Sequence, residues 1–595
     1  MKDFNLSGKE IWFVDFEFFN SEGELPIPIC LVAQELLSGQ IIRIWKEEFS
    51  NFKLPPYPIN SNAIFVAYYA SAEFGCHLSL GWQLPHYVID LCIEFKNLTN
   101  GLELPFNPDK KKKGRRGLID ALLYYGLDSI TYQEKEGMIN LILNEKWSEK
   151  DKEYIWSYCE SDVKALSQLW YKIIPQINIS YALLRGEYMK CAAIMERYGI
   201  PIDHTLYTIL KDNWEMIKET LISKIDKEYN VYENGKTFKT AKFEAWLKKN
   251  NYIWPRHDSG HLKLDDKTFS EMSKIYPNIN PLRELRVTLN RMRLNDLSIG
   301  SDYRNRFILS AFGSITGRNQ PRNNKNIFGP SVWLRVLIKP SQGYAIVYID
   351  WSQQEFGIAA ALSKDQNMMN SYLSGDPYLQ FAKLAGVVPE NATKETHPRE
   401  RDLFKQCALG VLYGMGKKSL SIRIGGDERE AEKLIALHHK TFPKFWTWIE
   451  NVFDYAQLYG YLKTVFGWTL HITTKTKETT IKNFLMQSNG AEMMRLACCY
   501  AIQNGVKICT PIHDALLIEA PVETIEESIR ATKQAMAKAS KVVLDGFELT
   551  SDVKRIDSPA RYSDPRGEKM WNTVNDIINE FGLAENRLSM NKLSI

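Results

Sequence analysis

Two acidic residues on one apolar segment give the first indication of chemistry in this chain. Asp15 and Glu17 stand two positions apart in "WFVDFEFF", which is rich in residues typical of β-strands. On a strand, both carboxylates would point to the same face. Two acids on an apolar face are costly unless a cation or hydrogen-bond donors accompany them. Such pairs are common without a metal, so this one needs partners elsewhere in the chain.

Two further segments could supply those partners. Tyr158 and Asp162 are four positions apart in a helical segment, so the phenol and the carboxylate share a helix face. Glu73 stands where the strand-like "AIFVAYYA" passes into a short helix. The four carboxylates could converge on two divalent cations, with Tyr158 orienting a water molecule. Two cations of this kind clamp the attacking and leaving oxygens of an in-line phosphoryl displacement.

A second set of acids comes from two predicted strand ends. In "AIVYIDWSQQEFGIAAALS", apolar residues lead to Asp350, which alone could be a turn residue or a helix N-cap. Asp514 lies at the expected turn of a hairpin in "CTPIHDALLIEAP". If the two strand ends meet across a sheet, the acids form hard oxygen ligands for Mg²⁺, which takes its remaining ligands from water and substrate phosphates. His513, taken alone, is more often structural than catalytic.

A stripe of unusual composition lies between those acids. Its members recur every four residues in "RERDLFKQCALGVLYGMGKKS", and they are Arg401, Lys405, Leu409 and Tyr413. On a helix they would drift slowly around one face, over about 18 Å of axis. Two cations followed by an apolar residue and an aromatic ring, with Gly414 after them, indicate a surface for phosphates and a flat base. The alternative is a solvated basic face with a buried tyrosine.

The pattern of the chain indicates several domains. Residues 9–95 contain strand-like segments and short helices, and Ser148 can N-cap a helix that Pro175 closes, so a first α/β domain ends near residue 178. Residues 180–300 are amphipathic and helical. Residues 306–363 are expected to return to strands, 366–458 to helices, and 459–520 to mix a helix with a hairpin.

Composition narrows the function classes. The 595 residues contain 75 Lys and Arg against 71 Asp and Glu, so any surface for a polyanion must be local. The basic run Lys110–Arg116 is typical of a solvated loop, with DNA contact as the alternative. No apolar run is long enough to span a bilayer, and no secretion signal is evident. The nine cysteines include no C-x-x-C pair, which argues against a zinc ribbon or disulfide scaffold.

Taken together, these segments resemble the motifs of family A, or DNA polymerase I-like, DNA polymerases. "DWSQQE" resembles the first polymerase motif, the Arg401 to Gly414 stripe the fingers-helix motif, and "IHDA" the third motif. "SITGRNQPRNNKNI" resembles the T-G-R segment before the palm, and "NFLMQ" resembles N-x-x-x-Q. Upstream, "DFE" and Tyr158-x-x-x-Asp162 resemble motifs of the proofreading exonuclease. The resemblance covers nearly the whole chain in the family's order.

The resemblance implies an α/β multidomain fold, in which an RNase H-like 3′–5′ exonuclease domain precedes a right-hand polymerase. The expected division is 1–178 for the exonuclease, 179–305 for the thumb, 306–365 for the first part of the palm, 366–458 for the fingers, and 459–595 for the second part of the palm and a C-terminal tail. No 5′-nuclease domain is expected. A chain of this length is similar to polymerases of bacterial viruses.

The resemblance also implies roles in DNA-templated extension of a primer. The expected metal ligands are Asp350, Asp514 and the carbonyl of Trp351. Residues on the nucleotide side are Arg401 and Lys405 for the triphosphate, Tyr413 near the base pair, Glu355 against a ribose 2′-hydroxyl, and Leu409 and Gln354 beside them. Lys405 would also protonate the leaving pyrophosphate. The expected DNA contacts are Arg318, Asn483 and Gln487 in the minor groove and His513 at the primer terminus.

In the exonuclease, the resemblance implies Asp15, Glu17, Glu73 and Asp162 as metal ligands and Tyr158 as the residue that positions water. Two Mg²⁺ ions are expected in each site, with Mn²⁺ as a substitute. The expected partners are primer–template DNA and deoxynucleoside triphosphates, without a membrane, for a monomer that works with replisome accessory proteins. The expected compartment is the cytoplasm of a bacterium, or of the host if the chain is viral.

Three departures from the motifs bear on these roles. Ala515 stands in place of the motif's Glu and leaves two palm acids, Leu409 replaces Phe or Tyr, and Glu73 replaces Asp. The alternatives are a DNA-binding protein, or an exonuclease with an impaired polymerase site. A single-subunit RNA polymerase would share the palm acids, but Glu355 and an exonuclease domain argue against it.

Overall fold

The computed structural model describes residues 4–105, 116–129, 131–144, 146–291, 294–329 and 331–583. They form two compact units. The first comprises Met1–Gly199, Ile308–Gln320 and Val347–Lys554, and the second comprises Ile200–Phe307, Pro321–Ile346 and Arg555–Ile595. Within the described ranges, no helix is both long and apolar enough to cross a membrane. Of the basic run 110–116, only Arg116 belongs to the described residues.

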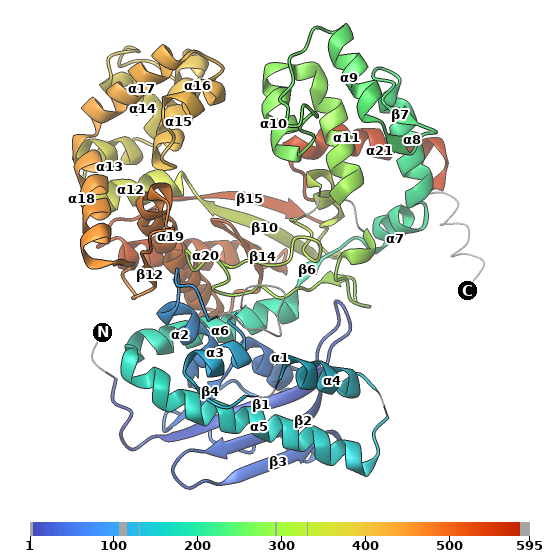
Figure 1. The fold of residues 1–595 in the computed structure, drawn as a ribbon, viewed down its shortest axis with the longest axis vertical. Helices are drawn as coiled ribbons and strands as arrows, with labels where there is room; N and C mark the ends of the chain where they lie inside the picture. The colour runs from blue at the N-terminus through green and yellow to red at the C-terminus, as the bar shows by residue number, and fades with distance from the viewer. Residues whose placement is uncertain are drawn as a thin grey trace. The chain divides into compact units, whose positions relative to one another are not determined.

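A mixed five-stranded sheet forms the N-terminal part of the first unit, with strand order β3-β2-β1-β4-β5 (Figure 1). We call it the N-terminal sheet, and its strands are β1 (Glu10–Phe19), β2 (Ile27–Glu35), β3 (Ile41–Trp45), β4 (Ala63–Ala67) and β5 (Tyr87–Asp90). β1 pairs antiparallel with β2 and parallel with β4. This mixed α/β arrangement agrees with the fold class expected for the start of the chain.

Helices cover this sheet. They are α1 (Ser71–Ser79), α2 (Leu91–Leu98), α3 (Leu118–Tyr124), α4 (Tyr132–Ile142), α5 (Glu149–Ile173) and α6 (Ile179–Tyr198). As expected, Ser148 caps α5, because its hydroxyl accepts a hydrogen bond from the backbone N–H of Asp151 at 3.3 Å. α5 then ends at Ile173, just before Pro175.

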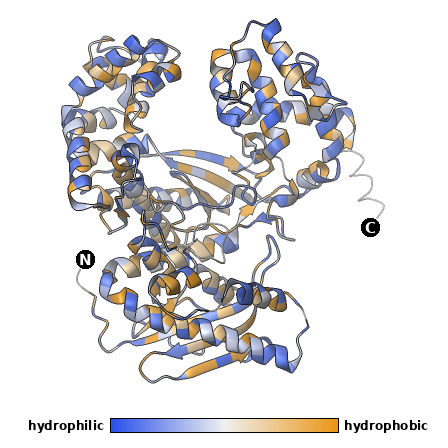
Figure 2. Ribbon diagram, viewed as in Figure 1, coloured by the Kyte–Doolittle hydropathy of each residue, from blue (hydrophilic) through white to orange (hydrophobic). Residues whose placement is uncertain are grey.

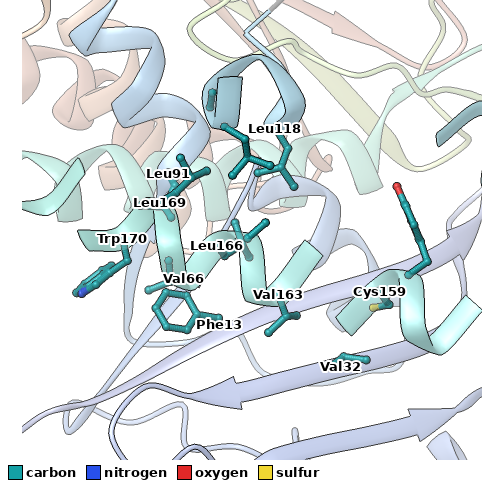
Figure 3. Packing of buried hydrophobic residues seen from close by; sticks show 14 of the residues in the cluster. Phe13, Val32, Val66, Leu91, Leu118, Cys159, Val163, Leu166, Leu169 and Trp170 are labelled. Atoms are coloured by element: carbon teal, nitrogen blue, oxygen red, sulfur yellow. The ribbon is translucent and has the colours of Figure 1, made fainter. Parts of the chain in front are cut away.

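The apolar stripe of α5 forms the core of this part of the molecule. Figure 3 shows Val163, Leu166 and Trp170 of the helix above Phe13 of β1. The Phe13 and Trp170 rings meet edge to face, with centroids 5.9 Å apart. Figure 2 shows the same division by hydropathy, with mostly hydrophobic strands and a helix that also carries hydrophilic residues. Burial of this stripe fixes which side of α5 faces the strands.

A four-stranded sheet, with strand order β13-β14-β10-β15, forms the second sheet of the chain, here called the central sheet. Its strands are β10 (Tyr344–Trp351), β13 (Ile508–Ile512), β14 (Ala515–Pro521) and β15 (Ser551–Asp557). The helices and the short hairpin of the same region are α12 (Gln354–Ser363), α13 (Gln366–Leu373), α14 (Pro377–Leu384), α15 (Pro398–Leu412), α16 (Lys417–Ile424), α17 (Glu428–Thr441), α18 (Pro443–Tyr459), β11 (Tyr461–Lys463), β12 (Thr469–His471), α19 (Glu478–Gln503) and α20 (Ile525–Val543).

The second unit is mainly helical, as the periodicity of residues 180–300 predicts. Its elements are β6 (Ile200–Pro201), α7 (His204–Asp212), α8 (Trp214–Asp226), β7 (Tyr232–Glu233), β8 (Thr237–Phe238), α9 (Thr240–Lys249), α10 (Asp266–Ile275), α11 (Asn280–Arg291), β9 (Arg304–Asn305) and α21 (Glu568–Glu580). Asp203 caps α7 and forms ion pairs with Lys339 at 3.2 Å and Arg561 at 2.6 Å. These pairs join three separate segments of the chain.

The expectation of strands over residues 306–363 is wrong for its first part. The described residues from 306 to 343 form turns, one 3-10 helix (Val332–Leu337) and an isolated bridge at Ile338. Glycine and proline explain the difference, because they favour turns and interrupt strand pairing. Gly317 has φ of 73°, and an added Cβ would lie 3.1 Å from Nε1 of Trp468. Among the described residues of 306–363, β10 is the only named strand, and residues 354–363 form the helix α12 instead of a strand.

A buried ion pair ties α6 and α2 to the β11–β12 hairpin within the first unit. Nε and Nη2 of Arg185 donate to the two carboxylate oxygens of Glu94, each at 2.6 Å, and Nη1 donates to the carbonyl of Phe466 at 3.0 Å. The Glu94 and Arg185 side chains are 0% and 5% exposed. Asn97 of α2 adds a hydrogen bond to the carbonyl of Gly467 at 3.1 Å. The hairpin is therefore joined to the N-terminal part through a desolvated charge pair.

Replacing Arg185 by Ala is expected to lower the free energy of unfolding by about 3–5 kcal/mol, because the Glu94 carboxylate is left buried and unpaired. Urea denaturation followed by tryptophan fluorescence measures the change. Lys475→Ala is the matched control, since the Lys475–Glu103 pair has exposed side chains (74% and 57%) and should contribute at most about 1 kcal/mol. Equal effects of the two substitutions would contradict this account.

Candidate active sites

The central sheet brings Asp350 and Asp514 together. Asp350 lies near the end of β10, and Asp514 lies in the two-residue turn between β13 and β14, as the hairpin pattern predicts. The backbone N–H of Trp351 donates to the carbonyl of Asp514 at 3.2 Å. His513 occupies the same turn with φ of 54°, in the left-handed region. We call Asp350 and Asp514 the central acid pair.

The charges of this pair oppose one another. Burial, then the charges of Asp514 and Asp552, raise the pKa of Asp350 from 3.8 to about 6. Burial also raises the pKa of Asp514, while the nearby His513 and Arg318 lower it. Two carboxylates that repel each other in a partly desolvated place are a suitable ligand pair for a divalent cation.

Asp552 is an acid that the motifs did not single out. It lies on β15, which pairs with β10 at the edge of the central sheet. Its carboxylate accepts a hydrogen bond from the hydroxyl of Ser352 at 2.7 Å, and the backbone N–H of Ser352 donates to Thr550 at 3.0 Å. Ala515, in place of the motif's Glu, is fully buried. Part of the negative charge near Asp350 thus comes from a strand about 200 residues away.

The cationic stripe lies on α15, as predicted, and Tyr413 is the C-cap residue of that helix. Nε of Arg401 pairs with a carboxylate oxygen of Asp376 at 2.5 Å. The ring of Tyr378, on α14, lies near both cations, with its centroid 6.0 Å from Cζ of Arg401 and 5.9 Å from Nζ of Lys405. Lys405 has no ion pair among the described residues. Both cations therefore lie near the same ring, and among the described residues only Arg401 also forms an ion pair.

α12 faces this stripe. The chain leaves β10 through Ser352 and Gln353, whose φ is 45°, and α12 begins at Gln354. The hydroxyl of Tyr413 donates a hydrogen bond to the carboxylate of Glu355. Burial, then that carboxylate, raise the pKa of Tyr413, so its hydroxyl stays protonated and remains a donor. The pair joins the end of α15 to the start of α12.

Four other predicted residues lie on α19 or near it. Gln354 is buried, with its Nε2 unpaired among the described residues, and an added Cβ on Gly490 of α19 would lie 3.3 Å from its Oε1. The same Cβ would lie 3.7 Å from Nη2 of Arg318. Asn483 and Gln487 are half-buried and four residues apart on α19, so they share a face. The structure records no role for Leu409 beyond its place on α15.

The N-terminal sheet forms the second site. Asp15 and Glu17 lie on β1, Glu73 on α1 and Asp162 on α5; these four carboxylates are here called the N-terminal acid cluster. Glu73 is 4% exposed and accepts a hydrogen bond from the backbone N–H of Phe16 at 2.9 Å. The sheet and two helices therefore converge on one place, as the sequence predicts.

The acids of this cluster are near enough for their charges to repel one another. Burial, then the charge of Asp162, raise the pKa of Asp15 to about 8. Burial and Asp15 raise the pKa of Glu17 and of Glu73 as well. Burial, then the charge of Asp162, raise the pKa of Tyr158, which lies one turn earlier on the same face of α5.

Two residues near this cluster belong to no motif. Cys159 places its sulfur 3.2 Å from Oδ2 of Asp15, and Lys135 of α4 lowers the pKa of Asp15 by its charge. Neither could be found from spacing, because Cys159 is apolar in character and α4 is separate in sequence. Ligand atoms of Asp15, Glu17 and Cys159 all lie within 4.8 Å of one another. The oxygens in this group and in the central acid pair are of the kind that Mg²⁺ and Mn²⁺ bind.

Replacing Asp350 by Asn is expected to raise the melting temperature in EDTA at about pH 8. The folded-state pKa, about 6, exceeds the ordinary value of 3.8, so folded wild-type protein binds the extra proton between these values. Wild-type stability therefore falls as the pH rises through this window, and Asn removes that loss. The increase in melting temperature caused by Asn should shrink as the pH falls from 6 toward 3.8. Calorimetry at about pH 8 and near pH 3.8 measures the change in melting temperature. The exposed Asp545→Asn is the control. An unchanged or lower melting temperature of Asp350→Asn at about pH 8 would contradict the repulsion between the acids.

Comparison with known proteins finds similarity to one protein family in the central region of the chain. Residues 321–554 match the family model described as DNA polymerase family A. DNA polymerase I, thermostable, of Thermus thermophilus is 32% identical over 212 residues, which are 33% of this chain and 25% of that protein. DNA polymerase I of Aquifex aeolicus is 24% identical over 452 residues, which are 72% of this chain and 74% of that protein. The chain spans about a quarter of the length of the first curated relatives.

The fold has a counterpart among solved structures. The POL domain of Pol1 from M. smegmatis, in complex with a DNA primer-template and dNTP, matches with a TM-score of 0.68 at 17% identity, over 92% of this chain and 95% of that one. The likeness extends through the N-terminal sheet as well as the central one. Residues 321–554 of this chain are thus similar to family A DNA polymerases in sequence, within a chain whose fold is similar to that of the POL domain.

Proposed function

We propose that the chain is a DNA-templated DNA polymerase that extends a primer 3′ end with deoxynucleoside triphosphates and proofreads it with a 3′–5′ exonuclease. One observation carries the proposal: Asp350 and Asp514 repel each other in the central sheet, and a helix with two cations lies in the same compact unit. Paired acids and cations suit a reaction in which a triphosphate loses pyrophosphate.

The palm residues in this proposal are Asp350 and Asp514, with the Trp351 carbonyl as a further ligand. They would hold two Mg²⁺ ions, or Mn²⁺ in their place, and these ions supply charge neutralisation and activation of the primer hydroxyl when bound. Arg401 and Lys405 bind the triphosphate, and Lys405 gives a proton to the leaving pyrophosphate. Both cations can bind the same triphosphate because α15 presents them on one face.

The remaining contacts select the substrate. Glu355, fixed by its hydrogen bond from Tyr413, closes the space that a ribose 2′-hydroxyl would need. Leu409 and Gln354 border the same nucleotide. The minor groove of the primer–template duplex contacts Arg318, Asn483 and Gln487, and the primer terminus contacts His513. Arg318 is well suited to this because its charge also reaches Asp514 and Tyr413.

The N-terminal acid cluster is the proposed exonuclease site. Its four carboxylates would hold two Mg²⁺ ions, and Tyr158 orients the water that attacks the terminal phosphodiester. The position of Tyr158 one turn before Asp162 on α5 supports this role, because it places the phenol near the acids. Phosphodiester hydrolysis at this cluster would remove one nucleotide at a time from a 3′ end.

The proposed division of the chain follows the sequence prediction. Residues 1–178 are the exonuclease, 179–305 the thumb, 306–365 and 459–595 the palm with its tail, and 366–458 the fingers. The proposed partners are primer–template DNA and deoxynucleoside triphosphates, for a monomer that works with replisome accessory proteins. The proposed compartment is the cytoplasm of a bacterium or of a viral host.

Replacing Asp350 or Asp514 by Ala is expected to lower primer extension by at least about a thousandfold, because a lone carboxylate cannot hold both cations. Gel analysis of a labelled primer–template with Mg²⁺ and nucleotides measures it. Degradation of single-stranded 3′ ends should persist in the same variants, which shows that they are folded. A variant that still extends primers would refute the palm assignment, and wild-type shortening without extension would favour an exonuclease with an impaired polymerase site.

Replacing both Asp15 and Glu17 by Ala is expected to abolish shortening of a single-stranded 3′ end and to leave extension near the wild-type rate. The reason is that the two acids belong to the N-terminal sheet, while extension uses the central one. A time course without nucleotides measures shortening. Exposed Glu149→Ala on α5 is the control, since it belongs to no site. Unchanged shortening in the double variant would place the nuclease elsewhere.

A further inference from the structure

A buried thiol touches the N-terminal acid cluster. Cys159 is 0% exposed, and Figure 3 shows it on α5 beside the strands of the N-terminal sheet. Its sulfur lies 3.2 Å from Oδ2 of Asp15 and 3.4 Å from the backbone carbonyl of the same residue. The thiol is therefore in contact with the acid that stands first in the proposed exonuclease site.

The contact is specific to the acid. Among the described residues, the Cys159 thiol is the only recorded hydrogen-bond donor to the carboxylate of Asp15. The other groups around that carboxylate are Asp162, which repels it, and the more distant Lys135, which attracts it. A carboxylate among like charges needs a donor to keep one orientation, because each rotamer that moves it away from its neighbours is favoured by repulsion.

Two elements hold the thiol in place. Cys159 follows Tyr158 on α5, so its side chain leaves the helix about 100° away and enters the core beneath the acids. On the sheet side, Cys30 of β2 lies opposite Glu17 in the strand register, and burial and then the neighbouring Cys30 raise the pKa of the Cys159 thiol. The donor is thus fixed from the helix and from the strand that neighbours β1.

We infer that Cys159 is a positioning residue of the proposed exonuclease: its S–H holds the Asp15 carboxylate in the orientation that binds a divalent cation. This inference rests on the proposed exonuclease function. A thiol is a weak donor, so it orients the acid without neutralising its charge. Partners that orient a metal ligand commonly contribute ten- to hundredfold to metal affinity or activity, and the weak donor indicates the lower end, about tenfold.

The test compares variants of the full chain by direct metal binding. In an Asp350→Asn/Asp514→Asn background, binding of Mn²⁺ measured by electron paramagnetic resonance reports the N-terminal acid cluster. Cys159→Ala removes the donor, whereas Cys159→Ser keeps an O–H in the same place. Cys92→Ala is the matched control, because Cys92 is buried in the same part of the chain and its thiol lies 3.9 Å from the backbone carbonyl of Arg116, which belongs to neither proposed site.

The expected result is an about tenfold weaker Mn²⁺ affinity and an about tenfold slower removal of single-stranded 3′ ends in Cys159→Ala. Cys159→Ser should recover most of both losses, Cys92→Ala should lose neither, and primer extension by Cys159→Ala with the natural central acids should stay unchanged. Wild-type affinity in Cys159→Ala would overturn the inference, as would equal losses in the Ala and Ser variants. If wild-type protein binds Mn²⁺ but never shortens DNA, the exonuclease proposal fails, and the affinities alone still decide the role of Cys159.

Discussion

Repulsion between carboxylates that the backbone forces together is the constraint on which the rest of this structure depends. It arises twice, in the central acid pair with Asp552 and in the N-terminal acid cluster. Neither group of acids would stay together in an unconstrained chain, so each is held by a sheet strand and by elements distant in sequence. The apolar contacts of α5 with β1 and the pairing of β10 with its neighbours offset that repulsion. Such local conflicts between charge and burial are expected where function, rather than stability, selects the residues.

The two acid groups belong to one compact unit, and a desolvated charge pair helps to unite its parts. Glu94 and Arg185 connect α2, α6 and the β11–β12 hairpin, so the N-terminal sheet is not an independent appendage of the polymerase domain. A buried ion pair adds little net stability compared with apolar packing, but it is costly to break and tolerates few alternative geometries. That property suits a junction whose main requirement is a single arrangement. Exposed pairs such as Lys475–Glu103 at the same junction can add only modest support.

Much of this arrangement follows from local pattern, and the remainder depends on contacts across the chain. The strand of Asp15 and Glu17, the cap at Ser148, the turn at Asp514 and the helix with Arg401 were predicted because each is set by neighbouring residues. Asp552 could not be found in this way, since its place beside Asp350 arises from strand pairing over about 200 residues. From the sequence, Cys159 cannot be told from an ordinary core residue, because its contact with Asp15 depends on the sheet that packs beneath the helix. Residues 306–343 misled the prediction because their shape comes from glycine, proline and tertiary contact, not from periodicity.

The ion pair between Arg401 and Asp376 means that the helix proposed to receive the triphosphate is already partly neutralised. A phosphate that approaches Arg401 does not meet a bare cation; it must share the guanidinium with a carboxylate or replace it. Nucleotide entry then has the character of anion exchange, in which one charge-assisted hydrogen bond is formed as another is given up. Lys405, which lies over the ring of Tyr378 and forms no ion pair among the described residues, has its charge available for the incoming group. Discrimination between a triphosphate and simpler anions would therefore depend on whether the ligand can engage both cations at once.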